Sequence, residues 1–162
     1  MRVTAVPLTA QAFTSFGDVL DDAASPDYVI NDGACARHHD RARLEVDSAG
    51  RLGISVFVSR CYTLPLTVDT LERHPLGSQA FIPLSREPYL VVVAPDEGDR
   101  PGSLQAFVAS SGQGVNLHKG IWHGVLTPLG NDGHFAVVDR IGPGENCDVH
   151  RLDSPCIVEA LP

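Results

Sequence analysis

The chain has 162 residues, enough for one domain with a substantial buried core. Its 20 acidic and 12 basic residues give a formal net charge of −8, which argues against a nucleic-acid partner or an anionic membrane surface. No apolar stretch approaches the roughly 20 residues of a membrane span, and the N-terminus lacks the apolar core of a signal peptide. No two of the four cysteines form a C-x-x-C pair. We therefore expect a single domain over residues 1–162, located in the cytoplasm, without membrane or nucleic-acid partners.

A short helix is expected near the N-terminus, in the stretch "TAQAFTSFG" at residues 9–17. Thr9 is a suitable N-cap, because its hydroxyl can accept a hydrogen bond from the first turn. Gly17 is a suitable point for the helix to end.

The rest of the chain is dominated by short runs of β-branched and aromatic residues. These runs are "SPDYVIND", "LGISVFVSR", "QAFIPL", "PYLVVVA", "SLQAFVA" and "HFAVVDR", and clusters of Gly, Pro, Asn and Asp separate them. In the second run Leu52, Ile54, Val56 and Val58 alternate and therefore share one face of a strand. Many short strands divided by turn signals predict an all-β sandwich or barrel.

Two stretches carry the side chains that are suited to chemistry. In "LERHPLGSQAFIPL", residues 71–84, Glu72 and His74 are two apart, so they share one face of a strand while Arg73 points the other way. Gln79 follows five residues after His74. The second stretch, "GQGVNLHKGIWHGV" at residues 112–125, contains His118 and His123 together with the only tryptophan and the only lysine.

The spacing of these residues resembles the two cupin motifs. The H-x-H and Glu positions of the first motif are occupied here by Glu72, His74 and Gln79. The second motif places Gly, Pro, Gly, His and Asn at positions that here hold Gly112, His118, Gly120, His123 and Thr127. The resemblance implies a cupin-type antiparallel β-barrel (double-stranded β-helix or jelly roll) with one short N-terminal helix. Its four metal-ligand positions would be Glu72, His74, Gln79 and His123.

Longer stretches resemble the ureidoglycolate lyase family. They are "PLTAQAFTSFGDVL", "RHHDRARLEV", "ERHPLGSQAFIPL", "GVNLHKGIWHGVL" and "VDRIGPGENCDV", which together span nearly the whole chain in order. The resemblance implies cleavage of (S)-ureidoglycolate to glyoxylate and urea in allantoin degradation. It also implies a homodimer and an association with a divalent metal, nickel.

This reaction requires one proton to leave the substrate hydroxyl and one to reach the departing urea nitrogen. Histidine and carboxylate side chains can do both, so Glu72, His74, His118 and His123 are the candidate catalytic residues. Gln79 and Asn116 are expected to contact the ureido group, and Arg73 is the candidate for the substrate carboxylate. Near the end of a strand, Asp139 and Arg140 are expected to form a structural ion pair.

Three other functions are compatible with the same residues. A metal-dependent cupin oxygenase or isomerase would need firm metal binding, which Gln79 disfavours because a neutral amide is a poor ligand. A non-catalytic cupin could bind a small metabolite as a sensor. Ammonia-releasing hydrolysis of ureidoglycolate is a variant of the lyase reaction. The metal, the stereospecificity and the division between acid and base remain open at this stage.

Overall fold

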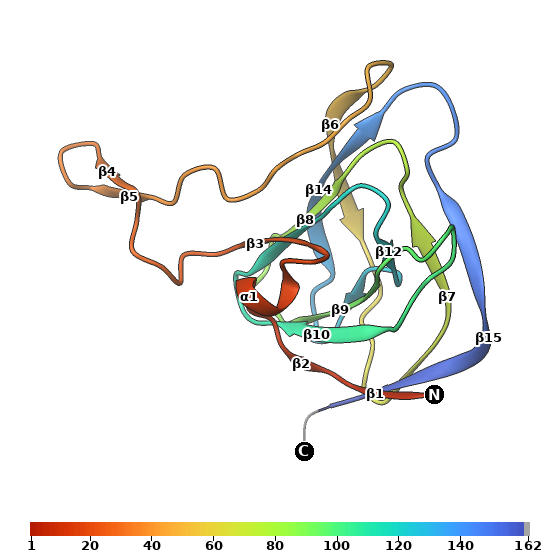
Figure 1. Cartoon of the computed structure of the whole chain (residues 1–162). Coiled ribbons are helices and arrows are strands. Elements are labelled where there is room, and N and C mark those ends of the chain that lie inside the picture. Colours follow the sequence, from red (N-terminus) through yellow and green to blue (C-terminus); the bar gives the residue numbers. More distant parts are fainter. Residues whose placement is uncertain (161–162) are drawn as a thin grey trace.

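The computed structural model describes residues 1–160 and consists almost entirely of strands (Figure 1). The elements are β1 (Arg2–Thr4), β2 (Val6–Pro7), α1 (Ala10–Phe13), β3 (Gly17–Leu20), β4 (Tyr28–Ile30), β5 (Cys35–Arg37), β6 (Arg51–Val58), β7 (Leu66–Arg73), β8 (Gln79–Pro83), β9 (Tyr89–Ala94), β10 (Gln105–Ala109), β11 (Gly114–Leu117), β12 (Trp122–His123), β13 (Thr127–Pro128), β14 (His134–Ile141) and β15 (Asp148–Glu159). The predicted all-β, cupin-type fold is confirmed, and each of the six predicted runs forms a strand.

The predicted helix is confirmed but is shorter than its sequence stretch. The hydroxyl of Thr9 accepts a hydrogen bond from the Ala12 amide at 3.2 Å, as an N-cap should. The helix ends at Phe13, and Gly17 starts the next strand instead of ending the helix.

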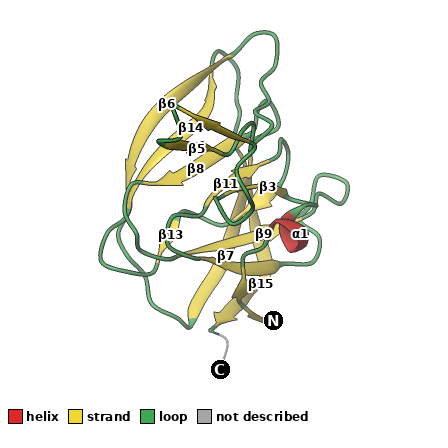
Figure 2. Ribbon diagram, turned by 90° about the vertical axis from the view of Figure 1, so that its left-hand side faces the viewer, coloured by secondary structure: helices red, strands yellow, loops and turns green. Residues whose placement is uncertain are grey.

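Two sheets face each other across the barrel. The larger has eight strands in the order β1-β15-β7-β12-β9-β10-β2, with β13 also paired to β9, and the smaller has the order β3-β11-β8-β14-β6. The pairings are antiparallel except for β1 with β15 and β2 with β10. Figure 2 shows the β6–β14–β8 side of the barrel lying over the β7–β9–β15 side.

The space between the sheets is filled by aromatic and branched side chains. Val91, Val93 and Phe107 of the larger sheet pack there with Phe81 and Val137 of the smaller one. A second apolar cluster covers the opposite face of the larger sheet, so every residue of β9 is buried. Burial on both faces explains why "YLVVVA" is apolar without alternation.

The outer face of the smaller sheet is apolar and open. The alternating residues of β6 share one face as predicted, but that face points away from the core. Ile54, Val56 and Val58 are 78%, 65% and 69% exposed. Ile82 of β8 and Leu84, which directly follows β8, are exposed as well. Because β6 pairs on one side only, it is also the edge strand of this sheet.

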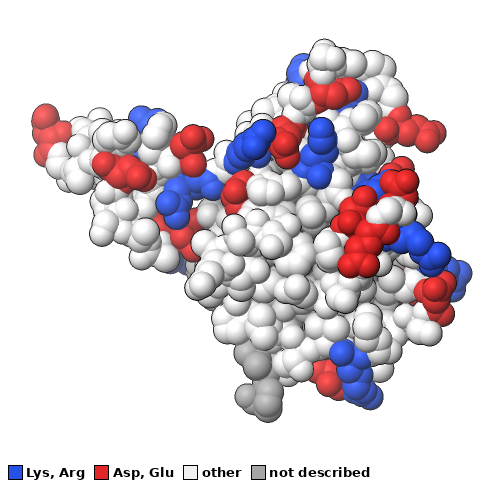
Figure 3. All heavy atoms as spheres, viewed as in Figure 1, with Lys and Arg blue, Asp and Glu red and all other residues white. Residues whose placement is uncertain are grey.

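A hairpin of β4 and β5 extends from the barrel as an arm (Figure 1). Its strand β4 exposes Tyr28, Val29 and Ile30. No helix within residues 1–160 is long and apolar enough to cross a membrane. Figure 3 shows charges of both signs over the arm and the upper and right-hand edges, while the centre of this face carries few charged residues.

Candidate active site

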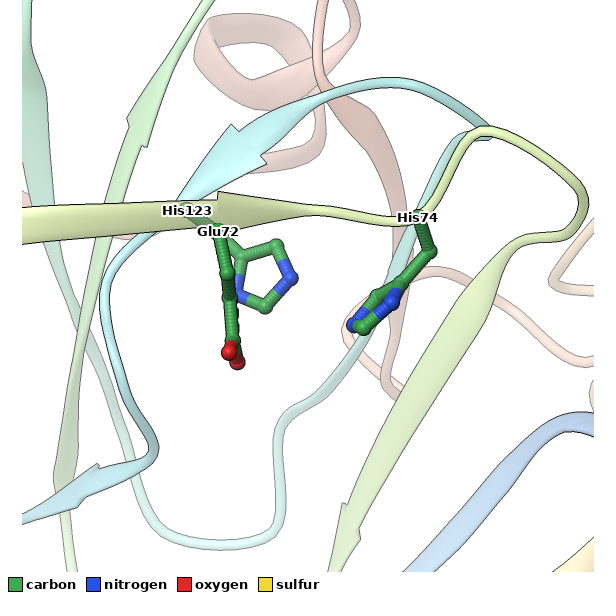
Figure 4. A group of neighbouring side chains, drawn as sticks. All are labelled: Glu72, His74 and His123. Carbon is green, nitrogen blue, oxygen red and sulfur yellow. Dashed lines mark ion pairs between the residues drawn. The ribbon is translucent and has the colours of Figure 1, made fainter. Parts of the chain in front are cut away.

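Glu72, His74 and His123 converge at one end of the barrel (Figure 4). Strand β7 carries Glu72 and leads into His74, while β12 places His123 directly opposite Glu72 in the antiparallel register. One ligand atom from each residue lies within 4.8 Å of the others. The two imidazole rings are 5.2 Å apart between centroids, and His123 Nδ1 is 3.9 Å from Glu72 Oε1. The structure therefore brings together three of the four residues expected to be catalytic.

Hydrogen bonds to backbone carbonyls orient both imidazoles. His74 Nδ1 is 2.5 Å from the Asn146 carbonyl oxygen, and His123 Nδ1 is 3.0 Å from that of Gly124. A carbonyl can only accept, so each neutral ring carries its proton on Nδ1 and presents the lone pair of Nε2. Both Nε2 atoms are buried without a hydrogen-bond partner among the described residues. Two bare lone pairs of this kind are typical metal ligands held by a supporting hydrogen bond.

Burial keeps His123 neutral. Its side chain is 3% exposed, and this desolvation lowers its pKa to about 4. The carbonyl of Gly124 acts in the opposite direction, and the neighbouring His74 lowers the pKa of His123 further. At neutral pH the Nε2 lone pair of His123 is therefore free for a cation or an acidic proton.

Gln79 and Asp139 form a polar pair on the smaller sheet. Gln79 Nε2 donates to Asp139 Oδ2 at 3.3 Å, which leaves Gln79 Oε1 and Asp139 Oδ1 buried without partners in the described chain. Gln79 lies on the same face of β8 as Phe81, whose ring is 6.4 Å from that of His123. The hydrogen bond from the amide of Gln79 thus leaves its oxygen, the better ligand atom, unengaged.

Asp139 was missed as a site residue, because an ion pair with Arg140 was expected. That expectation is wrong: Arg140 Nε donates to Asp47 Oδ1 at 2.6 Å. Neighbouring residues of a strand point to opposite faces, so Asp139 turns inward with Val137 while Arg140 turns outward. The alternation of "HFAVVDR" was the signal that could have placed Asp139 inside.

Cys147 lies beside this cluster and was also missed. Its thiol donates to Glu72 Oε2 at 3.7 Å. Burial first, and then the charge of Glu72, raise the pKa of the Cys147 thiol. The thiol therefore stays protonated at neutral pH and acts as a weak donor to the carboxylate.

His118 and Asn116 lie away from the cluster. On β11 the inward residues are Val115 and Leu117, so Asn116 points to the other side, where its amide donates to Asp18 Oδ2 at 2.9 Å. His118 Nε2 is 3.2 Å from the same oxygen. Burial alone would raise the pKa of Asp18, but hydrogen bonds from Asn116 and the Arg43 amide lower it below its usual value. These residues anchor the segment that joins the arm to the barrel.

Arg73 also turns away from Glu72, as strand alternation predicts. Its guanidinium donates to Asp96, Asp99 and Asp148 at 2.7–2.8 Å and lies 4.8 Å from the ring centre of Trp122. With three carboxylates and an aromatic face engaged, Arg73 is a structural cation on the outside of the barrel.

A cavity of about 660 Å³ lies elsewhere, between the arm and the barrel. Its lining includes Asp21, Asp22, His38, Arg41 and Arg86, so charges of both signs are mixed within it. None of the residues of the Glu72 cluster lines this cavity.

The donor set of the cluster suits a borderline divalent metal. Two imidazole nitrogens and the carboxylate of Glu72 are the ligand types that nickel, zinc and iron accept, and Gln79 Oε1 is a further neutral oxygen. Unpartnered polar atoms buried in a barrel are costly unless something binds them. The residues therefore fit the group that the cupin frame implies.

Comparisons with known proteins agree with the sequence analysis. The family model described as "Ureidoglycolate lyase" matches residues 1–159. The chain is 52% identical over 158 residues to a protein of Rhodobacter capsulatus named ureidoglycolate lyase, covering 98% of each chain. It is 47% identical over 154 residues to ureidoglycolate lyase 2 of Rhizobium meliloti, covering 94% of each chain. A ureidoglycolate lyase of Chelativorans sp. is 47% identical over 155 residues, covering 95% of this chain and 94% of its own.

Proposed function

This chain belongs to the ureidoglycolate lyase family, and we propose that it cleaves (S)-ureidoglycolate to glyoxylate and urea as a step of allantoin degradation. The reaction takes place at the cluster of Glu72, His74 and His123. The observation that carries this proposal is the pair of buried, unpartnered Nε2 atoms on two histidines that cluster with the carboxylate of Glu72. A site with bare acceptors suits a cation and a substrate rich in N–H and O–H groups.

The ligands of a divalent metal, nickel by family resemblance, would be Glu72, His74 and His123, with Gln79 Oε1 completing the set. A metal held there would supply Lewis acidity to a substrate oxygen. The carbonyls of Asn146 and Gly124 hold the two imidazoles in the required tautomer. Asp139 holds the amide of Gln79 with its oxygen free.

Asp139 is the proposed proton carrier. The reaction moves one proton from the substrate hydroxyl to the leaving urea nitrogen and consumes no water, so one carboxylate can accept the proton and return it. Asp139 Oδ1 is buried and accepts no hydrogen bond within residues 1–160, which leaves it available as the acceptor. Proton transfer by a positioned side chain contributes about 10²–10⁴-fold to the rate.

The test is turnover of racemic ureidoglycolate, with glyoxylate, urea and ammonia measured separately. Because this substrate decays spontaneously, the rate without protein is subtracted. The lyase reaction releases glyoxylate and urea in equal amounts, whereas ammonia in place of urea would indicate hydrolysis. Absence of any turnover by metal-loaded protein would refute the proposal.

Variants of the cluster locate the reaction. We expect His123→Ala to lower kcat by at least about 10²-fold while the circular dichroism spectrum is unchanged, because the lost group acts in the transition state. The kcat of Asp139→Asn should fall by a similar factor. This variant should still bind the metal, measured by isothermal titration with Ni²⁺. A folded His123→Ala protein with the parent rate would remove the cluster from the mechanism.

We also propose that the protein forms a homodimer through the outer face of the smaller sheet. Ile54, Val56, Val58, Ile82 and Leu84 make this face apolar, and solvent-exposed patches of that kind usually mark interfaces. Strand β6 is also an unpaired edge that a second copy would protect.

Light scattering tests the dimer. The double variant Ile54→Glu with Val56→Glu should give the monomer mass at a concentration where the parent gives twice that mass. Ser103→Glu, on an exposed loop, adds a charge elsewhere and should leave the dimer intact. A dimeric double variant would rule out this face.

The proposed location is the cytoplasm. The cysteines Cys35, Cys61, Cys147 and Cys156 are all free, and unpaired thiols are typical of a reducing compartment.

A further inference from the structure

The substrate carboxylate needs a positively charged side chain that the cluster itself does not supply. Ureidoglycolate is an anion, and the carboxylates of Glu72 and Asp139 offset the two positive charges of a divalent metal held there. A cationic side chain beside this site would therefore favour the anion. Arg73 is engaged by three aspartates and Arg140 by Asp47, so neither arginine is available to the substrate.

Arg51 starts β6 at the same end of the barrel. The start of β6 and the end of β14 lie together at the upper end in Figure 1, and the chain runs toward this end after β7. In the antiparallel register Gly53 pairs with Asp139 and Arg51 with Ile141. Residues two apart share a face, so Arg51 and Gly53 lie on the inward face to which Asp139 belongs.

The guanidinium of Arg51 folds back over Gly53. A Cβ placed on residue 53 would stand 3.6 Å from Arg51 Nη1 and 2.4 Å from Ile141 Cγ1. The side chains of Ile141 and Arg51 therefore occupy the space over Gly53 that a side chain at this residue would need. Since Gly53 directly opposes Asp139, the guanidinium lies over the cross-strand neighbour of the proposed proton carrier.

Arg51 is free to bind a ligand. Within residues 1–160 its guanidinium makes no ion pair, and its one side-chain hydrogen bond goes to the Leu52 carbonyl at 3.3 Å. Arg140, on the outward face of the neighbouring strand, instead donates to both carboxylate oxygens of Asp47 and to the Pro143 carbonyl.

We propose that Arg51 binds the substrate carboxylate from the rim of the barrel, which makes it a substrate-binding residue for the reaction above. The inference rests on the proposed function for the identity of the substrate. The planar guanidinium can hold a carboxylate with two parallel hydrogen bonds. A substrate carboxylate held at Arg51 would leave the carbon that carries the hydroxyl and the ureido nitrogen directed toward Asp139 and the metal ligands.

Two stable ligands test this contact without turnover. N-carbamoylglycine keeps the carboxylate and the ureido group of the substrate but lacks the hydroxyl, and its primary amide is the matched neutral probe. We expect the metal-loaded parent protein to bind the carboxylate about 10- to 100-fold more tightly than the amide, as loss of a charge-assisted contact implies. Arg51→Gln should remove this preference, and Arg51→Lys should restore part of it.

Kinetics on ureidoglycolate provide the second measurement. Arg51→Gln should raise KM about 10- to 100-fold, with kcat changed much less, because the contact is present before and during the reaction. Arg86→Gln is the matched control. Arg86 is exposed, follows β8 at the end opposite to Gln79, and makes no ion pair in the described structure.

The outcomes separate this inference from the proposed function. A protein that prefers N-carbamoylglycine through Arg51 but does not cleave ureidoglycolate would refute the lyase activity and leave the anion contact intact. A preference for the carboxylate that survives in folded Arg51→Gln, or a parent protein with no preference, would overturn the role of Arg51.

Discussion

Replacement of Arg73 by methionine distinguishes a structural cation from a substrate-binding one. The side chain of Arg73 is 12% exposed, while its partners Asp96, Asp99 and Asp148 are 36%, 85% and 45% exposed. Water screens the Asp99 pair most, so we assign it well under 1 kcal/mol. The other two bonds contribute about 1 kcal/mol each, and the contact with Trp122 about 0.5–1 kcal/mol. The expected loss of unfolding free energy is about 3 kcal/mol.

A chain of this size loses about 2–4 °C in Tm for each kcal/mol. Arg73→Met should therefore lower Tm by about 6–12 °C, measured by the unfolding transition in circular dichroism. KM for ureidoglycolate should stay within about twofold at a temperature where the variant is folded. The control Arg100→Met breaks a 3.4 Å pair with Asp153 in which both side chains are mostly exposed, and it should change Tm by no more than about 2–4 °C.

The opposite pattern would refute this reasoning. An Arg73→Met protein with the parent Tm and a KM raised tenfold or more would show that Arg73 binds the substrate carboxylate. The three aspartates would then be incidental neighbours, and the role assigned to Arg51 would fail as well.

Four further substitutions test the assignments around the site. Asn116→Ala and His118→Ala should leave KM and kcat near the parent values, and Asn116→Ala alone should cost about 1–3 kcal/mol of stability because Asp18 loses a buried donor; a tenfold loss of kcat in folded His118→Ala would return His118 to the mechanism. Gln79→Ala should weaken Ni²⁺ binding about 10- to 100-fold in titration calorimetry, and unchanged affinity would remove Gln79 from the ligand set. Gly53→Ala should lower Tm, since the added methyl would stand 2.4 Å from Ile141 Cγ1, and a fully stable variant would contradict the close packing at the rim.

Local periodicity in the sequence determined much of this protein. Short runs of β-branched residues between turn signals were enough to predict the all-β class, because strand alternation and turn chemistry act over a few residues. The same local rule placed Glu72 and His74 on one face and Arg73 on the other. The N-cap at Thr9 was also predicted from the sequence, because a helix cap depends on only a few neighbouring residues. The family resemblance rested on motif spacing, which the chain carries in linear order.

Only the tertiary structure decided which faces meet. The register of β12 against β7 sets His123 opposite Glu72, and that pairing depends on strands about 50 residues apart. The face of β14 that carries Val137 and Asp139 points into the barrel. The residues of β6 that pair with this face also point inward, so the apolar face of β6 points outward. His118 and Asn116 lie in the same motif as His123, yet β11 turns them to Asp18 because Val115 and Leu117 occupy the core positions. A single sequence shows that a strand has two faces, but long-range packing selects the one that lines the site.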